Sequence, residues 1–525
     1  MYPIKKVQFY ILIIAIIFFV ACQKEKKDIP PNIIYILMDD LGYGDINAFN
    51  SNSKIKTPRI DQIAKEGIIF TDAHSSSSVC TPTRYGILTG RYNWRSRLKK
   101  GVLNGVSTAL ISKDRTTVAS LLKNNGYNTG FIGKWHLGWN WSISDKIINE
   151  DINSDRQGII NKIDFSKNIT HSPNDLGFDY AYGHSGSLDM APYVYVENER
   201  ATAQINRFTT GQKSYSWWRN GPTASDFVHE EVTPHFFDKA FKFIRESVKK
   251  ENPFFLYLPL PSPHTPILPT KEWKGKSGLN EYGDFVMQLD YHVGKLDDLV
   301  KNLGISENTM IIFTSDNGCS PEANFKLLKE KGHYPSGPYR GHKADIFEGG
   351  HRVPFIIKWP KKINAGLVSD KTVCTTDFLA TCAAILNEKL SDQEGVDSFS
   401  MLPLFSDQVK QKFKRQFTIH HSINGSFAIR KGKYKFIFCR DSGGWSSPKP
   451  SKNEGKNLPK FQLYNLKNDP SESINLYGKF PKIENELISS FKSILINGRS
   501  TSGEKQENFS NFQSNEKWDP LIVFD

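Results

Sequence analysis

The chain has 525 residues, far more than one small hydrophobic core requires, so we expect one large domain with an appendage or two to three domains. A hydrophobic content of 38% fits a globular protein, and 68 basic against 55 acidic side chains give a formal charge of +13. That excess indicates either an ordinary basic surface or an anionic partner. The six cysteines form no Cys-x-x-Cys pair, which excludes zinc-ribbon and thioredoxin-type sites.

The N-terminus predicts export. Lys5 and Lys6 precede an apolar run, Val7–Ala21, that is too short for a transmembrane helix and is typical of a secretory signal. A small residue followed by Cys22 resembles the end of a bacterial lipoprotein signal. We therefore expect a signal peptide over 1–21, lipidation of Cys22, a tether over 22–30, and an exported bacterial lipoprotein anchored to a membrane, periplasmic or at the cell surface. A signal anchor or ordinary cleavage nearby are the alternatives.

The first predicted strand, Ile33–Met38, is a continuous apolar run, which is typical of a buried parallel strand. Asp39 and Asp40 follow it directly. Carboxylates at this position lie at the carboxyl edge of the sheet, where open α/β folds bind ligands. A solvated turn would also explain these two residues taken alone.

A serine-rich stretch leads from the next short strand, Ile68–Phe70, to Cys80. The residues Tyr85–Leu88 predict the first turn of a helix that follows this cysteine. Residue 80 would then lie at a helix N-terminus, which favours negative charge. Four further cysteines, Cys319, Cys374, Cys382 and Cys439, allow up to two disulfides.

Three further predicted strands also end in polar side chains, and helical segments alternate with them. Thr129–Gly133 leads to Lys134 and His136, Phe254–Leu258 leads to His264, and Met310–Ser315 ends in Asp316 and Asn317. Polar clusters that follow four buried strands from distant parts of the chain favour a single site. We expect it along one edge of a mostly parallel sheet.

Beyond about residue 400 the pattern changes to short strands with close turns and a helix over Ile483–Leu495. The predicted fold class is α/β, with a large mostly parallel or mixed sheet sandwiched by helices. A smaller C-terminal α+β subdomain containing an antiparallel sheet completes it. We expect the catalytic domain over 31–400, the subdomain over 401–500 and a polar tail over 501–525.

The side chains at the predicted site indicate the chemistry. Carboxylates and an amide supply only hard oxygen ligands, which suit Ca²⁺ or Mg²⁺. Lysine, arginine and histidine around such a cation match a tetrahedral oxyanion such as sulfate or phosphate. A soft thiolate from Cys80 is a poor nucleophile beside a hard cation.

Two motifs carry a family resemblance. The stretch Cys80-Thr81-Pro82-Thr83-Arg84 with Leu88-Thr89-Gly90-Arg91 resembles the signature of type I, formylglycine-dependent sulfatases of the alkaline phosphatase superfamily. The stretch Gly133–Gly138 is similar to the second signature of that family. Asp39-Asp40, Asp316-Asn317 and the stretch Arg340–Lys343 also match the family, in the order in which it has them. The resemblance covers about residues 30 to 480.

The resemblance implies that Cys80 is oxidised to formylglycine and works as an aldehyde hydrate. One hydrate oxygen would attack sulfur to give a covalent sulfo-enzyme, and the second hydroxyl would expel sulfate by C–O cleavage. The implied cofactor is one Ca²⁺, rather than Mg²⁺. The implied metal ligands are Asp39, Asp40, Cys80, Asp316 and Asn317. The implied catalytic residues are Cys80, Arg84, Lys134, His136, His264 and Lys343, with the lysines binding sulfate, His136 as base and His264 as acid.

The resemblance is greatest to bacterial polysaccharide sulfatases, and the implied partners are a sulfated carbohydrate, a formylglycine-generating maturation enzyme and, through Cys22, a membrane, with no nucleic acid. Algal polymers such as ulvan or carrageenan and glycosaminoglycans are candidate substrates. Asp189 and His421 are candidate sugar contacts, and a structural role is the alternative for both. A phosphate or phosphonate ester hydrolase of the same superfamily and a non-catalytic glycan-binding lipoprotein are the competing functions.

Overall fold

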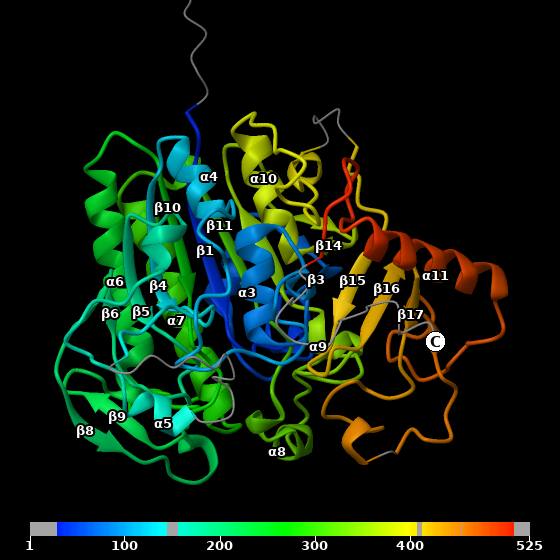
Figure 1. Cartoon of the computed structure of the whole chain (residues 1–525), viewed down its shortest axis with the longest axis horizontal. Coiled ribbons are helices and arrows are strands. Elements are labelled where there is room, and N and C mark those ends of the chain that lie inside the picture. The colour runs from blue at the N-terminus through cyan, green and yellow to red at the C-terminus, as the bar shows by residue number, and fades with distance from the viewer. Residues whose placement is uncertain (1–28, 144–155, 407–411, 453, 509–525) are drawn as a thin grey trace, which may run out of the picture.

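The computed structural model describes residues 29–143, 156–406, 412–452 and 454–508 and is built around a ten-stranded mixed sheet (Figure 1). The strand order is β13-β2-β12-β11-β1-β10-β4-β5-β6-β7. In chain order the strands are β1 (Asn32–Met38), β2 (Ile68–Phe70), β4 (Asn128–Lys134), β5 (Tyr180–His184), β6 (Val196–Glu197), β7 (Arg200–Ala201), β10 (Phe254–Pro259), β11 (Thr309–Ser315), β12 (Phe355–Lys358) and β13 (Leu367–Ser369).

The five central strands, β11-β1-β10-β4-β5, are all parallel. Met38 pairs with Ser315, Leu37 with Pro259, and Lys134 with His184, so these strands end at the same edge. The predicted meeting of polar strand ends is therefore confirmed. Outside this core β12 runs antiparallel to β11 and β2, which makes the sheet mixed.

Helices cover both faces of the sheet (Figure 1). The layer with α2 (Pro58–Lys65), α6 (Val232–Val248) and α7 (Glu281–Asn302) is held by contacts among these helices and to β4, β10 and β12. The opposite layer contains α3 (Cys80–Thr89), α4 (Val118–Asn124) and α10 (Phe378–Ile385). Short helices lie outside the two layers: α5 (Arg156–Ile160), α8 (Phe325–Glu330) and α9 (Glu348–His351).

The predicted C-terminal antiparallel sheet is present. Its strands are β15 (Thr418–His421), β16 (Phe427–Lys431), β17 (Tyr434–Ile437) and β18 (Gln462–Asn465), and α11 (Pro481–Ile496) packs on it. A two-stranded sheet of β3 (Ala73–His74) and β14 (Val373–Cys374) lies nearby in Figure 1. The hydrophobic core of the C-terminal sheet and α11 includes Tyr92 and Trp94, which come from the part of the chain that forms the large sheet. The two parts therefore share buried apolar surface.

The outcomes differ for the expectations about disulfides, membrane insertion and domain boundaries. The five cysteines in the described residues are free, so none of the possible disulfides forms there. Within the described ranges no helix is both long and apolar enough to cross a bilayer. The signal peptide and Cys22 fall outside the described residues. The domain boundaries remain predictions, although the first residue of the expected tail is attached, because Thr501 N donates a hydrogen bond to the Val396 carbonyl.

Candidate functional site

Helix α3 places Cys80 at the centre of the site. Cys80 is the first helical residue after Val79, whose backbone is extended, and it is only 2% exposed. Gly90 ends the helix in the left-handed conformation at φ 61°, which a glycine adopts without strain. The helix N-terminus therefore points its positive dipole end at residue 80, as the sequence predicts.

Four oxygen-bearing side chains lie beside this helix start. Asp39 and Asp40 follow β1, and Asp316 and Asn317 follow β11. One ligand atom from each of Asp39, Cys80 and Asp316 lies within 4.8 Å of the others. The Asn317 amide donates to Asp40 Oδ1 at 2.7 Å, which joins the fourth oxygen-bearing side chain to the group.

These oxygens fit a hard divalent cation. Asp39 Oδ1 and Asn317 Oδ1 are buried without a hydrogen-bond partner, which is costly unless another ligand engages them. Burial and the neighbouring Asp39 carboxylate raise the pKa of Asp316 to about 7. Burial acts in the same direction on Asp39, but Lys134, His264 and Arg84 bring its pKa below the usual range. Crowded oxygen ligands of this kind favour Ca²⁺ or Mg²⁺ over softer metals.

Three buried cationic side chains hold these carboxylates. Arg84 donates from Nε and Nη2 to Asp316 Oδ2 at 3.1 and 2.8 Å. Lys134 Nζ pairs with Asp39 Oδ2, and Lys343 Nζ donates to Asp40 Oδ2 at 2.8 Å. Three positive groups therefore balance three carboxylates, so a bound divalent cation would leave the site positive and suited to an anionic ester.

The two predicted histidines have defined hydrogen bonds. His136 Nε2 lies 2.8 Å from the Leu103 carbonyl, which only accepts, so Nε2 carries the proton and Nδ1 is a free lone pair. Burial, with help from Lys134, lowers the pKa of His136 well below its usual value. His264 Nδ1 donates to the Thr265 carbonyl at 2.6 Å, and its Nε2 lies 3.7 Å from Asp40 Oδ2.

Two residues of the site, Ser187 and His184, were not predicted from the sequence. Lys134 Nζ donates to Ser187 Oγ at 3.2 Å, and the same hydroxyl lies 3.3 Å from His264 Nδ1. His184 ends β5 opposite Lys134, and burial and that lysine lower its pKa to about 3. The signal was available, because Ser187 follows β5 in the same way as the other polar residues follow their strands.

The two candidate sugar contacts have different surroundings. Asp189 is buried close to the site, with Oδ2 paired to Arg219 Nη1 and Oδ1 without a partner. The His421 ring is 1% exposed and packs on Phe427, with 5.1 Å between ring centroids. Its backbone carbonyl faces the loop before Cys80, and Ser78 N donates to it at 3.0 Å. A sugar-binding role stays a prediction for both.

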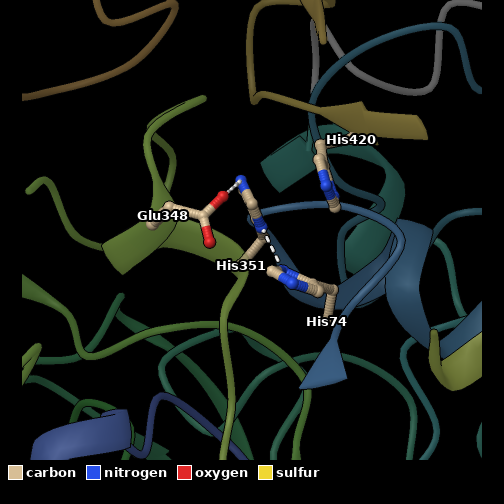
Figure 2. A group of neighbouring side chains, drawn as sticks. All are labelled: His74, Glu348, His351 and His420. Carbon is tan, nitrogen blue, oxygen red and sulfur yellow. Dashed lines mark hydrogen bonds and ion pairs between the residues drawn. The ribbon is translucent and has the colours of Figure 1, made fainter. Parts of the chain in front are cut away.

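A second buried polar cluster, of His74, Glu348, His351 and His420, lies where the C-terminal sheet meets the serine-rich loop (Figure 2). In Figure 2 His420 reaches from the C-terminal sheet toward His351, and their rings stack with 3.8 Å between centroids. Lys435 Nζ lies 3.0 Å from His351 Nε2, and His351 Nδ1 lies 3.0 Å from His74 Nδ1.

Each of these two histidines has a donor and an acceptor at its Nε2. His351 Nε2 lies 3.0 Å from Lys435 Nζ and 3.2 Å from the Ile346 carbonyl. His74 Nε2 lies 2.9 Å from Asp72 Oδ1 and 2.9 Å from Arg430 Nη1. The cluster is bordered by three acidic and three basic buried side chains, namely Asp72, Glu348, Glu472, Arg352, Arg430 and Lys435. Since both nitrogens of His74 and of His351 are engaged, a charge-balanced hydrogen-bonded network explains these two histidines, whereas both nitrogens of His420 are buried without a hydrogen-bond partner.

This network also braces the loop that carries residue 80. Ser75 N donates to the His351 carbonyl at 2.8 Å, and Ala344 N donates to the Ser78 carbonyl at 2.8 Å. Ser77 Oγ donates to the His421 carbonyl at 2.8 Å. The position of Cys80 therefore depends on Ala344, His351 and the strand that contains His421, all of which lie far later in the chain.

Comparison with protein families gives one match. The Sulfatase family model matches residues 31–388, which is more than half of the chain. The chain is 32% identical over 517 residues to an N-acetylgalactosamine-6-O-sulfatase of Bacteroides thetaiotaomicron, covering 90% of this chain and 95% of that protein. It is 30% identical over 481 residues to human arylsulfatase A, covering 89% and 87%.

Solved structures show the same fold. A Bacteroides thetaiotaomicron protein described under the metabolism of multiple glycosaminoglycans superposes with a TM-score of 0.76 at 31% identity, covering 89% of this chain and 99% of that one. The structure of Ps i-CgsB with k-i-k-neocarrahexaose gives a TM-score of 0.63 at 25% identity, covering 91% and 95%.

Proposed function

The chain belongs to the sulfatase family and is a sulfuric ester hydrolase, and on that premise we propose that it removes sulfate from a sulfated glycosaminoglycan or other polysaccharide, or from oligosaccharides derived from one. One observation carries the proposal. Cys80 lies at the start of α3 within 4.8 Å of the carboxylates of Asp39 and Asp316, with Lys134 and Lys343 paired to the adjacent oxygens. That arrangement suits a nucleophile facing an anionic ester.

Two groups complete the proposed site. Cys80 converted to formylglycine would supply a hydrate hydroxyl, a hard nucleophile that a thiol cannot provide. A Ca²⁺ held by Asp39, Asp40, Asp316, Asn317 and residue 80 would supply positive charge next to the ester oxygens. The unpartnered oxygens of Asp39 and Asn317 support the cation proposal.

The chain's own residues then have distinct tasks. Lys134 and Lys343 bind sulfate oxygens through their ammonium groups, and Arg84 steadies residue 80 from its fixed place on Asp316. His136 accepts a proton at its free Nδ1. In its protonated form His264 donates a proton to the leaving sugar oxygen from Nε2, which lies 3.7 Å from Asp40 Oδ2.

The proposed substrate class draws on the relatives. An N-acetylgalactosamine-6-O-sulfatase is among them, so the first substrate to test is a 6-O-sulfated hexosamine. A carrageenan oligosaccharide bound to Ps i-CgsB makes algal galactans the second class, with ulvan oligosaccharides beside them. The positive charge of +13 supports a polyanionic glycan. Asp189 and His421 remain proposed sugar contacts, and export as a lipoprotein anchored through Cys22 remains part of the proposal.

Mass spectrometry of the peptide that contains residue 80, combined with ester hydrolysis, tests this function. We expect formylglycine at residue 80, turnover of sulfate esters well above that of matched phosphate esters, and loss of activity in Cys80→Ser. Equal or faster phosphate turnover would favour a phosphate or phosphonate ester hydrolase. Binding of glycans without turnover of any ester would favour a non-catalytic role, and an unmodified thiol in active protein would overturn the formylglycine mechanism.

A further inference from the structure

A basic and aromatic hairpin lies next to the candidate site. It consists of β8 (Ile205–Thr209), β9 (Gly221–Ala224) and the segment between them (Figure 1). From residue 205 to residue 224 the sequence contains three basic residues, namely Arg207, Lys213 and Arg219, and no acidic one. Phe208 and Trp217 are 60% and 43% exposed. Exposed aromatic rings on a segment with a positive net charge are unusual for a surface that only contacts water.

The hairpin is attached on two sides of the site. Ile267, three residues after His264, donates a backbone hydrogen bond to the Tyr215 carbonyl at 2.8 Å. On the other side Arg219 N donates to the Asp189 carbonyl at 3.0 Å. The segment that carries Trp217 therefore connects the loop of the proposed general acid to the loop of the proposed sugar contact.

Arg219 is the residue that faces both the hairpin and the site. Its Nη1 pairs with Asp189 Oδ2, and its guanidinium lies 5.1 Å from the centre of the Trp217 ring. It also lines a small cavity together with the segment 104–106, which follows the Leu103 carbonyl that holds His136. The arginine therefore contacts both the exposed aromatic ring and the proposed sugar contact Asp189.

Some N–H donors of the Arg219 guanidinium are available to bind a ligand. A guanidinium has five N–H donors. Among the described residues, the hydrogen bonds of the Arg219 side chain all come from Nη1, and the side chain is 39% exposed. Asp189 Oδ1 is buried without a partner beside it. A donor fork and an acceptor are therefore both available at the same place.

We propose that Arg219 and Trp217 form a subsite for the sugar that adjoins the sulfated one, and that this neighbouring sugar carries its own anion. The inference rests on the proposed glycan sulfatase function. Arg219 receives the anion, a carboxylate or a second sulfate, through its free Nε and Nη2 donors, since a planar fork matches two oxyanion oxygens. Trp217 supplies a flat apolar face for the sugar ring, and Asp189 fixes the arginine.

The charge of the hairpin favours an anionic sugar over a neutral one as its ligand. The hairpin contains three basic residues and no acidic one, and only Arg219 among them pairs with a carboxylate, that of Asp189. An anionic oligosaccharide is therefore complementary to it, whereas a neutral glycan would use only the aromatic rings. Lys213 is exposed on the same segment and adds to its positive charge. The subsite is thus specific for the charge pattern of the polymer and not for the sulfate ester that is cleaved.

Steady-state kinetics on four sulfate esters test the proposal. The esters are 4-nitrophenyl sulfate and a 6-O-sulfated hexosamine linked to a neutral sugar, to a uronate or to a second sulfated sugar. We expect Arg219→Lys to raise KM about 10-fold or more for the ester with the recognised anion, because the point charge of a lysine cannot make the bidentate contact of a guanidinium. The kcat and the constants for the neutral-neighbour and aryl esters should change less than about twofold.

Two further variants complete the design. Trp217→Ala should raise KM for all three oligosaccharides and leave the aryl ester unchanged. Arg200→Ala removes the same charge from an exposed position that pairs with Asn168, and it should leave all constants unchanged. The uronate and second-sulfate arms identify which anion binds. Circular dichroism checks that each variant is folded.

The outcomes separate this proposal from the function it rests on. A wild-type enzyme, carrying formylglycine, that cleaves no sulfate ester overturns both. A wild-type enzyme that cleaves the oligosaccharides, with Arg219→Lys and Trp217→Ala unchanged on every ester, overturns the subsite alone. An equal loss for Arg219→Lys on the aryl ester also overturns it, because the arginine would then act only through Asp189 on the catalytic residues.

Discussion

We predict that acidic pH destabilises the folded protein through His421, by an amount that follows from the pKa of its side chain. Burial, the largest influence, lowers the pKa of this imidazole from about 6.5 to about 3 in the folded protein. The folded state therefore binds fewer protons than the unfolded state below the ordinary pKa. The buried, neutral His421 therefore does not lower the free energy of unfolding above about pH 6.5. Below that pH the free energy of unfolding decreases as the pH falls toward 3. At pH 5.0 the loss is about 2 kcal/mol, from 1.36 kcal/mol per pH unit.

The assay is urea unfolding of the wild type and of His421→Phe at pH 7.5 and pH 5.0. Phenylalanine keeps an aromatic ring against Phe427 and does not titrate, and the backbone carbonyl that holds Ser77 and Ser78 is unaffected. We expect the variant to lose about 2 kcal/mol less than the wild type between the two pH values, whatever its packing cost at pH 7.5.

Ile419→Val is the matched control. Ile419 is a buried residue of the same strand that carries no proton, so its substitution should cost about 1 kcal/mol equally at both pH values. If His421→Phe and the wild type lose the same stability on acidification, within about 0.5 kcal/mol, then the folded pKa of His421 is not depressed and the reasoning from burial is wrong.

Three other outcomes are expected. Dialysis against a chelator should reduce sulfatase activity at least about 100-fold, and Ca²⁺ should restore it while Zn²⁺ does not; full activity after verified metal removal would contradict the oxygen-ligand site. Lys134→Ala should lower kcat about 10²–10³-fold with the circular dichroism spectrum retained, and a change confined to KM would argue against transition-state stabilisation. Lys435→Met should destabilise the fold by about 3–5 kcal/mol in urea unfolding, because Glu348 and Glu472 lose a buried partner; a cost below about 1 kcal/mol would show that the network is dispensable.

The sequence predicted the site well because parallel strands end together. Apolar runs followed by polar residues located Asp39, Lys134, His264 and Asp316, and the register of the five central strands brings them to one edge. No knowledge of side-chain packing was needed for that step, since the topology alone determines which strand ends meet.

Contacts between distant loops could not be predicted in this way. Arg219 reaches Asp189 through a hairpin of its own, and no spacing in the sequence connects the two. The network around His74 and His351 assembles residues from four separate stretches, and its charge balance appears only after folding. Periodicity records which face of an element is buried, whereas such networks depend on which elements become neighbours.

The burial of residue 80 has a consequence for the order of events in the cell. Ser77 and Ser78 are covered by the strand Thr418–His421, which leaves the ribosome about 340 residues after Cys80 does, at about 5–20 residues per second. If an oxidising enzyme converts this cysteine, it must bind the nascent or unfolded chain in the interval before that strand docks. Slower docking would then increase the yield of active protein, and a chain that folds first would remain an unconverted thiol.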